Sequence, residues 1–185
     1  MNGAQRLIRT LVDCDVTVSF MNPGTSEMHF VAALDEVPEM RAILGLFEGV
    51  ASGAADGYGR MAGRPAATLL HLGPGLGNAI ANLHNARRAR TPVVNIVGDH
   101  ARDHLRFDPP LASDIESLAR PVSGWFRSSP GPDQVAGDTV DAVVAATGPP
   151  GAVATLVVPA DVTWLEAGDA VAVPLRSPPR AVRPE

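Results

Sequence analysis

The chain has 185 residues and a net charge of −5, with 19% charged and 4% aromatic residues. This length suffices for one domain with a sizeable core and is short for two. The acidic balance, with no basic cluster beyond Arg87-Arg88-Ala89-Arg90, argues against nucleic acid as the main partner. The single cysteine, Cys14, excludes an intrachain disulfide and a CxxC metal site. Because the chain has neither a signal-peptide core nor an apolar stretch of about 18 residues, we expect a soluble, cytoplasmic protein with no membrane partner.

Strand-like and helix-like segments alternate along the chain, as a parallel sheet with helices on both faces requires. The first half predicts helix 4–13, strand 16–20, helix 26–34, strand 41–46 and helix 48–61. The second half predicts strand 66–71, a loop at 72–74, helix 75–88, strand 93–97, a loop-rich stretch, helix 132–147 and strand 153–158. We therefore predict an α/β fold class, a three-layer α/β/α domain with a mostly parallel open sheet.

Glu48 lies where an acidic residue is least expected. It follows the apolar run 43–47, which reads as the end of a buried strand, and precedes the small-residue segment 49–55, which reads as a tightly packed helix. Burying an unpaired carboxylate costs several kcal/mol, so such a residue needs a partner or a proton-transfer task. The alternative interpretation is a capping acid at the start of a helix.

The distinctive residues of the chain follow the predicted strands. In open parallel sheets, ligands bind beyond the carboxyl ends of the strands. Four loops are therefore expected to converge on one edge, and they carry Asn22-Pro23-Gly24-Thr25, Glu48, His71 with Gly73–Asn78, and Gly98-Asp99-His100. The glycines at 73, 75 and 77 also admit a dinucleotide site with Asp99 as the ribose acid, although their spacing is not the G-x-G-x-x-G of that motif.

Five segments, taken in order, resemble one family. They are Asn22-Pro23-Gly24-Thr25-Ser26-Glu27, Phe47–Ala51, Ala54–Tyr58, Gly73–Asn78 and Thr91-Pro92-Val93. Together they are similar to the N-terminal, pyrimidine-binding (Pyr) domain of thiamine-diphosphate enzymes such as acetolactate synthase and benzoylformate decarboxylase. The resemblance is strongest to acetolactate synthase large subunit-like chains. It implies a flavodoxin-like Pyr domain over residues 1–168 and a Pro-rich linker over 169–185, which leads toward a central domain missing from this chain.

The resemblance implies a role for each candidate site residue. In the family, the glutamate that matches Glu48 hydrogen-bonds N1′ of the aminopyrimidine and so activates the cofactor that decarboxylates a 2-keto acid. Glu48 is thus the implied catalytic residue, and the implied cofactor-binding residues are Glu48, Pro23, Gly24, Gly73 and Asn78. The implied substrate-binding residues are Thr25, His71 and His100, with a core histidine as the alternative for His71.

Two departures from acetolactate synthase concern substrate choice. Typical members carry Pro-Gly-Gly where this chain has Pro23-Gly24-Thr25, and a small hydroxyl residue where it has His71. Benzoylformate decarboxylase carries serine and histidine at the positions that match Thr25 and His71. The pattern therefore favours an unassigned 2-keto acid lyase or carboligase, with a benzoylformate-type decarboxylase as one alternative and a nucleotide-binding module or non-catalytic partner subunit as others.

The resemblance also implies what this chain does not supply. In the family, magnesium and the diphosphate are held by a Gly-Asp-Gly motif with a later Asn in a separate domain, and this chain has no such motif. We therefore expect no metal ligands here, a diphosphate-binding domain or chain as partner, a homodimer or tetramer, and no activity from the chain alone; FAD binding to a central domain stays open. The helix stripe Gly49, Gly53 and Gly57 predicts either a subunit interface or tight packing within the chain.

Overall fold

The computed structural model describes residues 1–168, and the predicted linker 169–185 lies outside them. Its centre is a six-stranded sheet in the order β2-β1-β3-β4-β6-β5, in which every pairing is parallel. The strands are β1 Val18–Asn22, β2 Arg41–Leu44, β3 Ala66–Leu70, β4 Val93–Asp99, β5 Trp125–Ser128 and β6 Val153–Pro159. The helices are α1 Gly3–Asp13, α2 Met28–Ala33, α3 Glu48–Ala62, α4 Leu72–Ala89, α5 Ile115–Ala119, α6 Val135–Thr147 and α7 Ala160–Trp164, with single 3₁₀ turns at Thr25–Glu27, Leu34–Glu36 and Leu105–Phe107.

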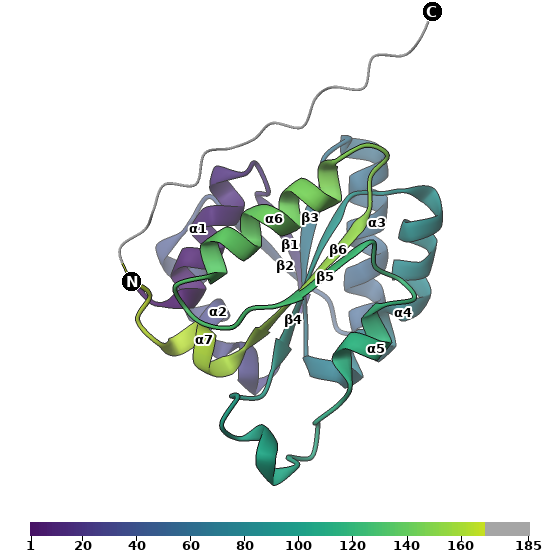
Figure 1. Cartoon of the computed structure of the whole chain (residues 1–185). Helices are drawn as coiled ribbons and strands as arrows, with labels where there is room; N and C mark the ends of the chain where they lie inside the picture. Colours follow the sequence, from purple (N-terminus) through teal and green to yellow (C-terminus); the bar gives the residue numbers. More distant parts are fainter. Residues whose placement is uncertain (169–185) are drawn as a thin grey trace, which may run out of the picture.

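The helices form a layer on each face of the sheet, which confirms the predicted three-layer α/β fold. Figure 1 shows α1 and α6 on one side of the strands and α3 and α4 on the other. Each layer encloses its own core: Leu7, Phe30 and Val143 belong to the first, and Leu76, Leu83 and Ile115 to the second. Strands β3 and β6 are buried along their whole length, which explains their nearly continuous apolar sequences.

The structure corrects the predicted character of segment 41–46. The strand ends at Leu44, pairs only with β1 and is largely exposed, so it is an edge strand and not a buried one. Leu46 is 91% exposed and Phe47 48%. The apolar composition of this run led to the error, because composition does not tell whether a strand has one neighbour or two.

Other predicted boundaries also shift. Helix α4 begins at Leu72, so residues 72–74 form its first turn and not a loop. Strand β1 lies two residues later than predicted, at Val18–Asn22. The loop-rich stretch contains the short elements α5 and β5, and α7 follows the last strand.

A buried row of polar side chains crosses the middle of the sheet. Thr68 Oγ1 donates to Asn95 Oδ1 at 2.7 Å, and Asn95 Nδ2 donates to Thr155 Oγ1 at 3.0 Å. Ser123 Oγ lies 2.6 Å from Thr155 Oγ1. These residues come from register-matched positions of β3, β4 and β6, and the three on the strands are fully buried. The row satisfies polar groups that would otherwise be costly in the core.

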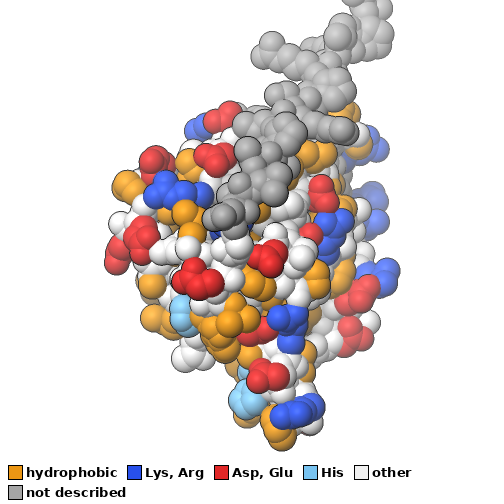
Figure 2. All heavy atoms as spheres, turned by 60° about the vertical axis from the view of Figure 1, so that its left-hand side comes forward, with side chains coloured by type: hydrophobic (Ala, Val, Ile, Leu, Met, Phe, Trp, Pro, Cys, Tyr) orange, Lys and Arg blue, Asp and Glu red, His pale blue; other side chains and the backbone are white. Residues whose placement is uncertain are grey.

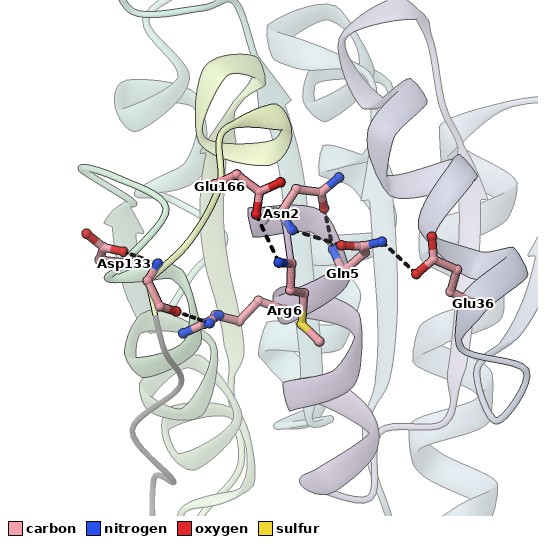
Figure 3. A network of polar contacts seen from close by, with 8 residues as sticks. Asn2, Gln5, Arg6, Glu36, Asp133 and Glu166 are labelled. Atoms are coloured by element: carbon pink, nitrogen blue, oxygen red, sulfur yellow. Dashed lines mark hydrogen bonds and ion pairs between the residues drawn. The ribbon is translucent and has the colours of Figure 1, made fainter.

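The first helix is tied to the last described residues (Figure 3). Asn2 caps α1, since its side chain accepts from Gln5 N at 2.9 Å while Gln5 Oε1 accepts from Asn2 N at 2.8 Å. Arg6 donates to the carbonyl oxygen of Gly168, whose own N–H donates to Asp133 Oδ1 at 2.6 Å. The backbone at Gly168 is therefore held between α1 and the segment that precedes α6.

Charged side chains of both signs are interspersed on the face that carries α1 and α7 (Figure 2). Among residues 1–168, no helix combines the length and the apolar character needed to span a bilayer.

Candidate active site

The four predicted loops do meet at the carboxyl edge of the sheet. The chain leaves β1 toward β2 but leaves β3 toward β4, so the connections diverge between β1 and β3. Such a switch point creates a crevice in open α/β sheets. Two of the predicted residues face each other there: a Cβ at Gly24, after β1, would lie only 2.3 Å from the ring of His71, after β3.

Glu48 is the first residue of α3 and is only 7% exposed. Asn78 Nδ2 donates to Glu48 Oε2 at 2.9 Å, and a Cβ at Gly75 would lie 2.9 Å from Glu48 Oε1. The carboxylate therefore lies against the first turns of α4, where only glycine leaves enough room. Oε1 accepts no hydrogen bond within residues 1–168, so this buried acid has one oxygen without a partner in the described part of the chain.

The loop that leads to Glu48 is held by β1. Asn22 Nδ2 donates to the carbonyl oxygen of Gly45 at 2.7 Å. The predicted capping role is not what the side chain does, because Phe47 is the N-cap and α3 has no side-chain cap hydrogen bond. Glu48 does place a negative charge in the first helical turn, which suits the helix dipole.

His71 is paired with an acid whose role the sequence did not reveal. His71 Nδ1 lies 2.7 Å from Oε2 of Glu27, which is 2% exposed. The same oxygen accepts from Gly24 N at 2.7 Å. His71 itself is the N-cap residue of α4 and remains partly exposed. The ring is therefore paired on its Nδ1 side, while the side chain as a whole is 22% exposed.

Burial raises the pKa of two carboxyl groups at this edge. For Glu27, the loss of hydration is the largest cause, opposed by the Gly24 hydrogen bond and by His71. For Asp99, burial again raises the pKa, opposed by the hydrogen bond from His100 N at 2.7 Å. Clusters of perturbed acids in a crevice are typical of functional sites.

Thr25 and His100 line a surface pocket of about 180 Å³. His29 and Trp164 also contribute to its wall, and their rings lie 5.7 Å apart. His100 Nε2 is enclosed and has no hydrogen-bond partner among residues 1–168. The structure thus brings Thr25 and His100 together in one pocket. His71 contacts Glu27, which belongs to the same 3₁₀ turn as Thr25.

The remaining predicted cofactor residues have contacts of their own. Asn78 positions Glu48, and Gly73 packs against Ser113, whose side chain would lie 2.2 Å from an added Cβ. Pro23 is half-buried in the loop after β1. The next residue after His71, Leu72, has a φ of 52°, a left-handed conformation that costs about 1 kcal/mol or more outside glycine. Such strain is typical of site residues.

The glycines of α3 pack mainly within the chain. A Cβ at Gly49 would lie 3.3 Å from Asn78 O, and one at Gly53 would lie 3.1 Å from Asn82 Nδ2, both on α4. Gly57 has no neighbour within 4 Å. Two positions of the stripe are therefore explained by the contact between α3 and α4, while the third faces open space.

The described residues also bear on the two other kinds of site, a dinucleotide site and a metal site. Gly73, Gly75 and Gly77 lie inside α4 and do not form an open phosphate-binding loop. Among the described residues, no three His, Cys, Asp or Glu side chains are grouped so as to hold a metal ion. His29, His84 and His104 are exposed.

The chain has clear relatives. It is 62% identical over 172 residues to IlvX of Mycobacterium tuberculosis, which carries the provisional name acetolactate synthase large subunit; the match covers 93% of this chain and 33% of that protein. Benzoylformate decarboxylase of Pseudomonas aeruginosa is 34% identical over 147 residues, covering 79% and 28%. The chain spans about a third of the length of these relatives.

The fold agrees with these matches. The solved structure of the thiamine diphosphate-dependent 4-hydroxybenzoylformate decarboxylase of Rhodococcus jostii superposes with a TM-score of 0.85 at 26% identity, over 91% of this chain and 32% of that one. The family model described as the N-terminal TPP binding domain of thiamine pyrophosphate enzymes matches residues 1–118. The chain therefore belongs to the thiamine pyrophosphate enzymes and corresponds to their N-terminal domain.

Proposed function

We propose that this chain is the cofactor-activating domain of a thiamine-diphosphate-dependent 2-keto acid lyase or carboligase. The observation that supports this most is Glu48, a buried carboxylate with one oxygen held by Asn78 and the other left for a ligand. The donor set fits an aminopyrimidine, because a carboxylate in a low-dielectric site makes a strong hydrogen bond to a ring nitrogen. When bound, thiamine diphosphate supplies the group that stabilises the electron pair left by decarboxylation.

In this proposal, some residues of the chain contact the cofactor and others contact the substrate. Glu48 holds or moves a proton at the ring nitrogen through Oε1, and Asn78 fixes its direction. Gly75 allows the carboxylate to lie close to α4. We assign Thr25, His71 and His100 to the substrate, because they follow β1, β3 and β4 at the carboxyl edge of the sheet. Thr25 and His100 line one pocket, and His71 pairs with Glu27 in the same turn as Thr25.

The complete enzyme requires parts that lie outside this chain. We infer that the diphosphate and Mg²⁺ are bound by a separate domain or chain. We also infer that the complete enzyme forms a homodimer or tetramer. Exposed apolar residues on β2 and along α3 support such pairing: Leu44 is 66% exposed, Val50 60% and Met61 90%. The cytoplasm is the compartment we propose.

The test is Glu48→Gln in the complete enzyme. The amide keeps the shape but cannot exchange a proton in the same way, so turnover of a 2-keto acid should fall at least about 100-fold. Glu39→Gln is the matched control, because Glu39 is an exposed carboxylate. Near-normal turnover of the Glu48 variant would reject the proposal.

A second measurement tests the division between domains. The 185-residue chain, titrated with thiamine diphosphate and Mg²⁺ while Trp125 and Trp164 fluorescence is followed, should bind more weakly than about 1 mM, which corresponds to about 4 kcal/mol. Saturable micromolar binding, or turnover by the chain alone, would show that the site is complete within it.

A benzoylformate-type decarboxylase is the second candidate. The pair Thr25 and His71 favours it, because the sequence places a hydroxyl and an imidazole where benzoylformate decarboxylase carries serine and histidine. The partial exposure of the His71 side chain, 22%, supports a contact with substrate. Comparing turnover of an aromatic and a small aliphatic 2-keto acid distinguishes the two candidates.

A further inference from the structure

Glu27 is a buried acid for which the proposed chemistry has no direct use. It is 2% exposed and lies in the 3₁₀ turn after β1, under the backbone of β4. A Cβ at Gly98 would lie 1.7 Å from Glu27 Oε1, so the strand passes directly over the carboxylate. Burying a carboxylate in such a place costs free energy unless a neighbouring group pairs with it.

The neighbour is His71. Glu27 Oε2 lies 2.7 Å from Nδ1 of the ring and also accepts from Gly24 N at 2.7 Å. Gly24 packs on the same ring, which limits its rotation. The imidazole is therefore fixed on one face by backbone and on its Nδ1 edge by the carboxylate, while Nε2 has no partner among residues 1–168.

A hydrogen bond over the 2.7 Å between Nδ1 and Oε2 requires one proton between these atoms, and basicity and the surroundings of Glu27 favour its location on the ring. An imidazole nitrogen is ordinarily more basic than a carboxylate by about 2 pKa units. The N–H of Gly24 adds a hydrogen bond that favours the ionised carboxylate. Burial raises the pKa of the Glu27 carboxyl and so reduces the difference in basicity between the carboxylate and the imidazole. A proton on Oε1 would find no acceptor there, since that atom is enclosed without a partner.

We propose that Glu27 is a positioning residue that holds His71 in the tautomer protonated on Nδ1, so that Nε2 is the ring atom presented to the ligand. With Nδ1 committed to Glu27, Nε2 can accept a hydrogen bond from a ligand, or donate one after protonation, without any rotation of the ring. The role toward a 2-keto acid rests on the function proposed above, whereas the tautomer does not.

The tautomer can be observed directly by NMR. The chain is labelled with ¹⁵N-histidine, and long-range ¹H–¹⁵N correlations are recorded at mildly alkaline pH, where neutral imidazoles show which nitrogen carries the proton. His71→Asn assigns the His71 signals among the five histidines. The wild-type chain should show the proton of His71 on Nδ1; a proton on Nε2 would overturn the proposal.

Two variants separate the carboxylate from mere packing. Glu27→Gln keeps an oxygen that can accept from both Gly24 N and Nδ1, so the Nδ1–H tautomer should persist. Glu27→Ala removes the acceptor, so His71 should shift toward the Nε2–H tautomer that an unconstrained histidine side chain prefers. An unchanged tautomer in a folded Glu27→Ala chain would overturn the proposal, and if that variant does not fold, the wild-type spectrum alone decides.

Turnover of the complete enzyme tests the consequence. Glu27→Ala should lower kcat about 10-fold or more and change KM less than about threefold, because orientation is lost while other contacts remain. Glu39→Ala serves as the exposed control. A shifted tautomer with unchanged kcat would reject the positioning role, whereas failure of the Glu48→Gln test would reject the proposed function and leave the tautomer result standing.

Discussion

Replacing Gly75 with alanine disturbs Glu48 without altering any charge. An added Cβ would lie 2.9 Å from Glu48 Oε1, while ordinary contact begins at 3.4 Å, so the carboxylate must move by about 0.5 Å. Alanine stabilises a helix interior by about 0.5–1 kcal/mol relative to glycine, and overpacking costs about 1–3 kcal/mol. The net loss of stability is therefore about 0–2.5 kcal/mol. A displacement of this size at the reacting group should lower kcat on the order of 10-fold.

Gly77→Ala is the matched control in the same helix. An added Cβ at Gly77 has no neighbour within 4 Å, so only the helix gain applies. Its melting temperature should rise by about 1–4 °C, with turnover unchanged. Melting is followed by circular dichroism on the chain, and turnover is measured in the complete enzyme. Full activity of the Gly75 variant, or equal loss in both variants, would refute the inferred closeness of Glu48 to α4.

Three further predictions concern the core, the buried acid and the substrate. Asn95→Val should lower the melting temperature by about 2–12 °C, because two buried threonines lose a partner, and an unchanged value would contradict the role of the polar row. Burial raises the pKa of Glu27 above its ordinary value of 4.5. The protonated residue therefore stabilises the folded state fully below pH 4.5, and this stabilisation is lost as the pH rises through the raised pKa. Glu27→Gln removes this titration, so its urea midpoint should improve relative to wild type as pH rises, and a constant difference would contradict the sign. Thr25→Gly combined with His71→Ser should change the ratio of kcat/KM between an aromatic and a small aliphatic 2-keto acid, and equal losses for both would mean that the pair is structural.

Periodicity predicted the fold well where each strand is buried on both faces. Strands β3, β4 and β6 have the continuous apolar runs that such burial requires, and their positions were nearly correct. It failed at β2, because the same apolar signal arises from an exposed edge. It also missed β5, a strand of four residues at the other edge, which carries too few positions to show a period.

The candidate site could be predicted for residues that stand out locally. Glu48 is conspicuous because its sequence neighbours are small or apolar. Glu27 gave a weaker signal, an acid just before the apolar side of a helix, which capping explains equally well. Its pairing with His71 joins positions 44 residues apart and depends on how β1 and β3 pair, which no local pattern encodes.

The polar row in the core bears on how the strands find their alignment. If β4 slid by two residues against β3 or β6, the apolar positions would still meet apolar positions, so hydrophobicity alone barely distinguishes the two arrangements. Asn95 distinguishes them, because a slip of β4 would separate its amide from Thr68 and Thr155. Each buried polar group left without a partner in this way costs about 1–3 kcal/mol. His71 directly follows β3 and His100 directly follows β4. The register that Asn95 favours therefore also sets the relative positions of these two histidines.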